Sequence, residues 1–265
     1  MCFRVFAIFL SWLVLVDATR AEAPARVDLE LALAIDVSGS VDPEEAALQR
    51  EGYLKAFADR EVLRAIVGGE RKRIAVTYFE WASFNYQRLV VDWTVVSDEA
   101  SAAEFVKKLS AMPISTERWT SISGAIDFAM KRFAASPYKG ARQIIDISGD
   151  GRNNNGRDLA EAREEALAQG IIINGLPIVN DRPTRWGTPP ERDLDLYYRD
   201  HVIGGPGAFF IVAEGFESFA NAIRTKLVRE IAARNEPSLA ILVGARSRVC
   251  CPPAVQLAER GRHGR

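Results

Sequence analysis

The chain has 265 residues, of which 48% are hydrophobic, 26% charged and 9% aromatic, a composition typical of a folded globular protein and not of a disordered, fibrous or repeat chain. Its 34 basic and 35 acidic residues give a formal net charge of -1, so there is no strong positive field to attract nucleic acid. Three cysteines and two histidines are too few for a disulfide framework or a four-cysteine zinc site.

The first residues have the pattern of a secretory signal. Arg4 precedes an apolar run over residues 5–16, and small residues follow up to Ala25. This order predicts that residues 1–23 are a signal peptide and that the protein is exported, to the periplasm or outside the cell. The apolar run is shorter than the roughly 20 residues of a membrane-spanning helix, so no permanent span is expected after cleavage. An uncleaved anchor is the alternative.

The next segment predicts a strand followed by a helix. Over residues 27–36, leucine or isoleucine alternates with other residues and small alanines lie on the second face, as in a strand that is covered on both sides. Asp42 and Glu45 have the spacing of a capping box, and Pro43 lies at the first helical position. The helix is expected to run to about Val67, before two glycines.

A hairpin and further alternating elements follow. Residues 73–83 and 88–96 predict two strands joined by a short polar turn, which places one antiparallel strand at the sheet edge. The remaining pattern predicts helices at 98–111, 121–135, 157–169 and 217–233, and strands at 142–148, 171–176 and 208–213. Residues 24–234 therefore predict one α/β domain, a doubly wound, mostly parallel sheet of about six strands with one antiparallel edge strand.

The last segment, residues 235–265, differs in composition from the domain. Residues 246–265 carry five arginines and one glutamate, which predicts a basic, poorly ordered tail. Cys250 and Cys251 are adjacent, and adjacent cysteines close only a strained ring. We therefore expect free thiols or an intermolecular bridge there.

Three predicted strand-end or loop segments carry oxygen-bearing side chains. The first strand ends in Asp36-Val37-Ser38-Gly39-Ser40, the central strand leads into Asp150, and Thr120 precedes the fourth helix. Loops at the carboxyl ends of parallel strands meet at one edge of the sheet, where ligands of such folds bind. Taken singly, these residues could also be helix caps or turn residues. Taken together, they predict an all-oxygen site for a hard cation.

These motifs resemble the von Willebrand factor type A (VWA) family, whose metal-ion-dependent adhesion site is an Asp-x-Ser-x-Ser motif followed by a Thr and an Asp on separate loops. The resemblance covers residues 27–234 and is closest to an uncharacterised exported bacterial branch. It implies a Rossmann-like fold and a Mg2+ or Mn2+ ion. It also implies direct ligation by the hydroxyl groups, with the two aspartates supplying charge and a partner's carboxylate completing the shell. The matching residues are Asp36, Ser38, Ser40, Thr120 and Asp150.

A long insert, residues 177–207, follows a strand at its carboxyl end and is expected beside this site. It contains residue types that are frequent in protein interfaces. An equally favoured alternative is that a short helix in the insert only covers the sheet edge, and that Asn153 only serves a turn. The candidate partner contacts are Asn153, Trp186, Tyr197, Tyr198 and Arg199.

The sequence thus predicts a metal-dependent protein-binding module and not an enzyme. Its partner would be an unidentified protein that presents an Asp or Glu carboxylate. A metal-dependent hydrolase is the alternative, because an open metal position can act as a Lewis acid. His201, however, has no nucleophile or orienting carboxylate at a recognised motif spacing. A structural scaffold with an unused metal site is the third hypothesis.

Overall fold

The computed structural model describes residues 24–179, 189–215, 218–233 and 241–242. The strands form one seven-stranded sheet in the order β3-β2-β1-β4-β5-β6-β7. Strands β2 and β3 pair antiparallel at one edge, and every other neighbouring pair is parallel. The predicted architecture is therefore confirmed. The seventh strand has only two residues and lies within the segment that was predicted to be a tail.

The strands lie close to their predicted positions. Their bounds are β1 Ala25–Asp36, β2 Ile74–Trp81, β3 Gln87–Val96, β4 Tyr138–Gly149, β5 Ile172–Val179, β6 Ile211–Glu214 and β7 Ile241–Leu242. Strand β4 extends about four residues before the predicted 142–148 and pairs with β1 on one side and β5 on the other. The two longest strands, β1 and β4, thus form the centre of the sheet.

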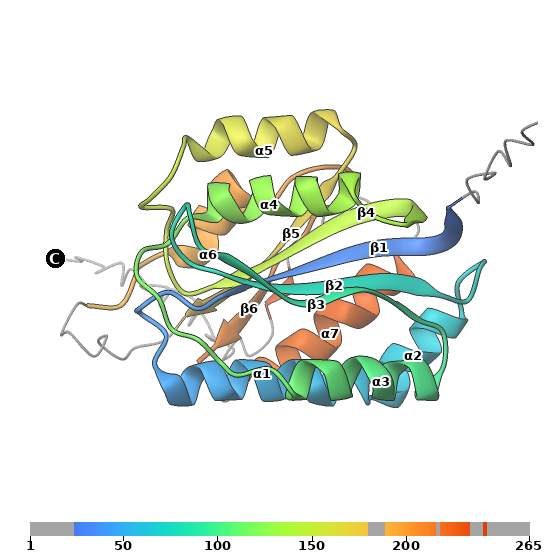
Figure 1. The fold of residues 1–265 in the computed structure, drawn as a ribbon. Coiled ribbons are helices and arrows are strands. Elements are labelled where there is room, and N and C mark those ends of the chain that lie inside the picture. The colour runs from blue at the N-terminus through green and yellow to red at the C-terminus, as the bar shows by residue number, and fades with distance from the viewer. Residues whose placement is uncertain (1–23, 180–188, 216–217, 234–240, 243–265) are drawn as a thin grey trace, which may run out of the picture.

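Helices cover both faces of the sheet (Figure 1). Helices α4 and α5 lie on one face, and α1, α2, α3 and α7 lie on the other. The bounds are α1 Pro43–Phe57, α2 Arg60–Val67, α3 Glu99–Ser110, α4 Ile122–Ala134, α5 Leu159–Ala168, α6 Leu194–Tyr197 and α7 Phe219–Ala232, with a π-helix, η1, at Tyr198–Val202. In the part of the chain that the structure describes, no helix is long and apolar enough to cross a membrane.

The expected first helix is divided in two. It begins as predicted, because the Asp42 side chain accepts the Glu45 N–H and the Glu45 side chain accepts the Asp42 N–H. It ends at Phe57, however, and a second helix begins after Asp59, whose carboxylate accepts the Glu61 N–H at 2.7 Å. Asp59 is a helix N-cap, and the sequence prediction overlooked that signal.

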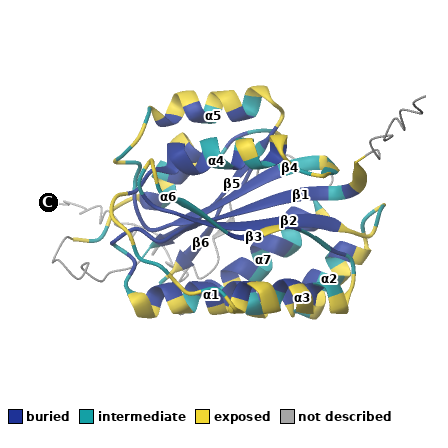
Figure 2. Ribbon diagram, viewed as in Figure 1, coloured by how far each residue is buried: buried dark blue, intermediate teal, exposed yellow. Residues whose placement is uncertain are grey.

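The sheet is buried on both faces, and the helices expose only their outer sides (Figure 2). Leu31 and Leu33 of β1 pack into the cluster formed with α1, α2, α3 and α7, whereas Ala32 and Ala34 pack toward α4 and α5. Successive side chains of a strand point to opposite faces. The leucine side chains of β1 therefore pack against one helix layer, and its alanine side chains pack against the other.

Candidate metal centre

Asp36 and the Asp150 loop meet at the carboxyl edge of the sheet, near α6 in Figure 1. Asp36 is the last residue of β1, and Ile35 pairs with Ser148 of the adjacent parallel strand β4. Asp150 follows Gly149, the last residue of β4. Both aspartates are buried. Parallel pairing of the two central strands therefore brings together carboxylates that are 114 residues apart in the sequence.

The serines of the first loop connect the two aspartates. The Ser38 N–H donates to Asp36 Oδ1 at 2.7 Å, and the Ser38 and Ser40 hydroxyl oxygens are 3.1 Å apart. The Ser40 hydroxyl donates to Asp150 Oδ1 at 2.6 Å. The polar atoms of these four residues thus form one contiguous hydrogen-bonded network, joined by the Ser38 N–H at Asp36 and by hydroxyls from Ser38 to Asp150.

Thr120 lies against the Asp150 loop. A methyl group built on Gly151 would be 3.3 Å from Thr120 Oγ1. The Thr120 N–H donates to Asn154 Oδ1 at 2.9 Å, and the Asn154 N–H donates back to the Thr120 carbonyl at 2.9 Å. The N-cap of α4 is Ser121, which accepts the Gly124 N–H. Thr120 is therefore not the N-cap of α4. Its hydroxyl lies beside Gly151, the residue that follows Asp150.

Burial makes both carboxylates costly to ionise. Burial raises the pKa of Asp36 well above its usual value, and the charge of Asp150 raises it further. Burial also raises the pKa of Asp150 to about 6, although the hydrogen bond from Ser40 opposes that shift. A buried pair of carboxylates without a nearby cation is the environment that a bound cation would stabilise.

The donor set fits a hard divalent cation. Asp36 Oδ2 is buried and has no hydrogen-bond partner among the described residues, and the neighbouring side-chain ligand atoms are carboxylate and hydroxyl oxygens. Among the described residues, no group of three or more His, Cys, Asp and Glu side chains is arranged to hold a metal. An oxygen site with two carboxylates suits a small cation that retains several waters.

The asparagines after Asp150 fasten the loops to one another. Asn153 Oδ1 accepts the Ser123 N–H at 3.1 Å, and Asn155 Oδ1 accepts the Phe84 N–H at 2.8 Å. Asn153 was a candidate partner contact. Its side chain is half-buried and binds the first turn of α4, so it holds two loops together and does more than serve its own turn.

The insert forms α6 and η1 beside the site. Trp186 lies outside the described residues. Tyr197 is half-buried, and its hydroxyl accepts the Asn153 N–H at 3.2 Å. Arg199 is exposed and pairs with Asp200 at 2.7 Å. Tyr198 is fully buried; the prediction that it touches a partner is corrected, because its side chain packs into the core that includes α4 and α5.

Two exposed aromatic residues at the same edge were not proposed from the sequence. Trp119 precedes Thr120, is 60% exposed and has a left-handed backbone with φ 66°. Phe84, in the turn between β2 and β3, is 61% exposed. A left-handed non-glycine residue is held by its surroundings at an energetic cost. Exposure and strain arise from the folded loops, so residue type alone could not reveal them.

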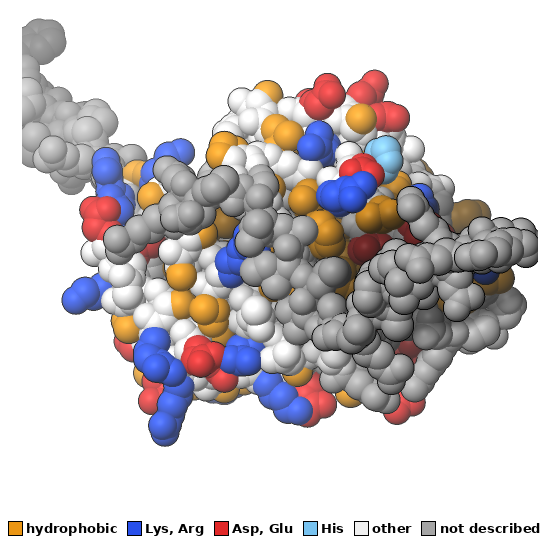
Figure 3. Space-filling model, turned by 180° about the vertical axis from the view of Figure 1, so that it is seen from behind, with side chains coloured by type: hydrophobic (Ala, Val, Ile, Leu, Met, Phe, Trp, Pro, Cys, Tyr) orange, Lys and Arg blue, Asp and Glu red, His pale blue; other side chains and the backbone are white. Residues whose placement is uncertain are grey.

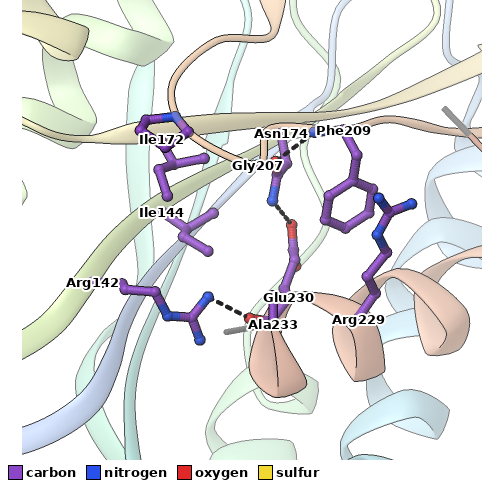
Figure 4. A pocket seen from close by; sticks show the side chains of 10 residues that line it. Arg142, Ile144, Ile172, Asn174, Gly207, Phe209, Arg229, Glu230 and Ala233 are labelled. Atoms are coloured by element: carbon purple, nitrogen blue, oxygen red, sulfur yellow. Dashed lines mark hydrogen bonds between the residues drawn. The ribbon is translucent and has the colours of Figure 1, made fainter. Parts of the chain in front are cut away.

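A separate cavity of ≈ 40 Å³ lies between β4, β5 and α7 (Figure 4). Asn174 Nδ2 donates to Glu230 Oε1 at 2.9 Å, and Arg142 Nη1 donates to the Glu230 carbonyl at 2.9 Å. Burial, together with the charge of Asp146, raises the pKa of Glu230 to about 7. Such a volume holds a few waters. None of the residues predicted for the metal site lines this cavity.

The family model described as "Protein of unknown function (DUF1194)" matches residues 26–235. The chain belongs to this family. No curated protein matches the sequence. The matched residues of this DUF1194 protein include the five residues of the candidate metal centre and the α6–η1 insert.

Solved structures show which fold the DUF1194 domain has. Proximal thread matrix protein 1 from the mussel byssus matches with a TM-score of 0.55 and 12% identity, over 81% of this chain and 48% of that chain. A von Willebrand factor type A structure from Catenulispora acidiphila matches with a TM-score of 0.54 and 14% identity, over 78% and 43%. The pilus adhesin SpaC from Lactobacillus rhamnosus GG matches with a TM-score of 0.53 and 12% identity, over 77% and 31%.

The DUF1194 domain therefore has the VWA fold, as the sequence motifs predicted. The chain spans less than half the length of these solved structures. A further structure of the mussel protein, at 13% identity and a TM-score of 0.54 over 78% of this chain and 46% of that chain, has a zinc-occupied MIDAS motif. At these identities the likeness establishes the fold alone.

Proposed function

We propose that this protein is a metal-dependent protein-binding module that holds a divalent cation, Mg2+ or Mn2+, at the carboxyl edge of its sheet. The observation that carries the proposal is the buried pair Asp36 and Asp150, which is linked by the Ser38 N–H to Asp36 at 2.7 Å, the Ser38 and Ser40 hydroxyls 3.1 Å apart, and the Ser40 hydroxyl to Asp150 at 2.6 Å. Ser38, Ser40 and Thr120 would ligate the ion, and the two aspartates would supply its charge. The zinc-occupied motif of the mussel protein is consistent with a cation at this place in the fold.

A carboxylate of the partner is the proposed group that completes the ion's shell. A cation held by two protein carboxylates keeps affinity for a further anionic ligand, and the attraction strengthens in a partly dry interface. This favours a partner that presents an Asp or Glu side chain. Bound there, the ion would polarise and orient that carboxylate.

The aromatic residues around the centre are the proposed recognition surface. Trp119 and Phe84 are exposed beside Thr120 and the Asn155 loop, respectively. Tyr197, which stacks with Arg152 at 4.8 Å, extends the surface on the side of the insert. Exposed aromatic residues that are held by a rigid scaffold are frequent anchors in protein interfaces.

The remaining sequence predictions are part of the proposal. Residues 1–23 would act as a signal peptide, residues 24–234 as the binding domain and residues 235–265 as a basic tail. The protein would then meet its partner in the periplasm or outside the cell. Residues 1–23 and most of the tail lie outside the described residues.

Metal-dependent capture tests this proposal. The purified protein, immobilised and loaded with Mn2+, should retain a partner from an extract of the native cell envelope. Both EDTA and Asp150→Ala should abolish that capture. A peptide from the partner that contains its Asp or Glu should compete, whereas the same peptide with Asn or Gln should not. Capture that survives EDTA would contradict the proposal, and metal-dependent turnover of a phosphoester or peptide would favour the hydrolase alternative.

A further inference from the structure

The Tyr198 hydroxyl is the only tyrosine hydroxyl in the described part of the chain that is buried without a hydrogen-bond partner. A buried hydroxyl without a partner destabilises the folded protein, so its position requires an explanation. Asp36 Oδ2 is likewise buried and without a partner. The Tyr198 hydroxyl can donate a hydrogen bond, and Asp36 Oδ2 can accept one.

The two atoms face the same gap. A methyl group built on Gly149 would lie 2.7 Å from Asp36 Oδ2 and 3.0 Å from the Tyr198 hydroxyl oxygen. Both atoms approach Gly149 this closely because residue 149 has no side chain, and the space beside Gly149 is the gap that they face. The charge of Asp36, after burial, is the next largest cause that raises the pKa of Tyr198 well above its usual value, as expected for close neighbours.

The Tyr198 ring is held firmly in this position. A methyl group built on Gly175 of β5 would lie 2.7 Å from Tyr198 Cδ1, so a second glycine accommodates the ring. Tyr198 begins the π-helix η1, and its carbonyl accepts the Ile203 N–H at 2.9 Å. Single π-turns inside helical segments are frequent at functional sites.

We propose that Tyr198 is a positioning residue of the metal centre: its hydroxyl, across the gap at Gly149, orients Asp36 through the carboxylate oxygen that Ser38 does not bind. Asp36 Oδ1 is already fixed by the Ser38 N–H at 2.7 Å. Asp36 Oδ2 has no hydrogen-bond partner among the described residues, so the Tyr198 hydroxyl, as a donor to it, would fix the second oxygen and hence the plane of the carboxylate. Partners that orient metal ligands typically change metal affinity 10- to 100-fold.

The same insert also fixes the second carboxylate loop. Tyr197, the residue before Tyr198, accepts the Asn153 N–H at 3.2 Å, and Arg152 lies over its ring at 4.8 Å. Of two consecutive tyrosines, Tyr197 thus contacts the Asp150 loop and Tyr198 lies beside Gly149, opposite Asp36. The insert is a structural layer of the metal centre, and the sheet-edge covering that the sequence suggested is only part of its role.

This inference rests on the proposed function where its test measures metal binding. A second measurement, which needs no metal, tests the inference separately. In calorimetric titration of the full chain with Mn2+, Tyr198→Phe should weaken binding by about tenfold or more. Tyr78→Phe, which also removes a buried tyrosine hydroxyl but in the core on the opposite face of the sheet, should leave the affinity within about twofold. Equal affinity of Tyr198→Phe and wild type would overturn the assignment.

The independent readout is a double-mutant cycle on urea unfolding in EDTA, with Tyr198→Phe and Asp36→Asn. The effect of Tyr198→Phe on the unfolding equilibrium constant should differ by at least about threefold between wild type and Asp36→Asn, because the hydroxyl and the carboxylate interact. Additive effects would overturn the inference even if the protein binds Mn2+. Absence of Mn2+ binding by wild type, with the coupling present, would contradict the proposed function and leave Tyr198 as the residue that positions Asp36.

Discussion

Asp150 is the residue whose ionisation opposes folding of the metal-free protein. Its pKa is raised from the ordinary 3.8 to about 6 in the folded chain, first by burial. A raised pKa of an acid means that stability is greatest below the unfolded pKa and is lost as pH rises through the folded pKa. The loss therefore falls between about pH 4 and pH 6.

Asp150→Asn should stabilise the metal-free protein at neutral pH. The amide has no charge to bury, and its oxygen can still accept the Ser40 hydrogen bond. In urea unfolding with EDTA at pH 7.5, the variant should be more stable than wild type by about 1 to 3 kcal/mol. The difference should become small at pH 4. A variant that is less stable at pH 7.5 would show that another interaction dominates at this position.

Trp119 is the residue that most directly tests the recognition surface. Trp119→Ala removes the exposed ring and should weaken partner binding by about tenfold or more, without changing Mn2+ affinity. Val67→Ala is the control, because Val67 is 42% exposed but ends α2, far from the metal centre. Surface plasmon resonance with the captured partner measures both variants. Equal loss in both, or none for Trp119→Ala, would contradict this role.

The sequence locates the residues of the candidate metal centre better than the surface around them. Asp36, Ser38 and Ser40 lie within five consecutive residues, and their motif depends only on the end of one strand. The burial of Tyr198 depends instead on two glycines in different strands, Gly149 and Gly175. No local sequence pattern carries that information. The sequence therefore predicts a surface contact at Tyr198, which is a core residue.

Helix α7 is attached to the sheet by a buried ion cluster as well as by apolar packing. Lys226 is fully buried and lies 2.5 Å from Asp146 Oδ1 of β4, and it also pairs with Glu230 one turn later. Removing this cation leaves the buried carboxylates Asp146 and Glu230 without their ion-pair partner. A substitution at Lys226 should therefore destabilise the protein more than the same substitution at an exposed position of α7.

Lys226→Met should destabilise the protein by about 3 to 5 kcal/mol in urea unfolding at pH 7.5. Arg224→Met is the matched control on the same helix, because Arg224 pairs with Glu61 at the surface, where both side chains are more than a third exposed. The control should cost less than about 1 kcal/mol. A similar small cost for Lys226→Met would mean that the two carboxylates are protonated and need no cation.

Elements with a strong local signal were predicted well. The capping box at Asp42, the hairpin of β2 and β3 and the central position of β4 all follow from sequence patterns that tertiary packing did not override. The expected first helix was too long, since Asp59 within it begins α2. The short helix α6 corresponds to the sheet-edge helix that the sequence suggested for the insert, whereas the π-turn η1 was not predicted; packing of Leu194, Tyr198 and Val202 in the core holds both in place.

At the scale of the whole molecule, the formal net charge of -1 gives no excess of positive charge that would attract a polyanion. Basic and acidic side chains are interspersed on the described part of the face shown in Figure 3. Coulomb attraction from such a surface is weak beyond a Debye length. The affinity of the proposed partner should therefore depend on the ion and on the aromatic recognition surface more than on long-range attraction.

Calorimetric titration with Mg2+ and Mn2+ tests the central claim most directly. Wild type should bind one divalent ion per chain, and Asp36→Ala should lower the affinity by more than tenfold, about 1.4 kcal/mol. Asp92→Ala, which removes an exposed aspartate from β3, should bind as wild type does. No binding by wild type, or equal binding by wild type and Asp36→Ala, would contradict the account.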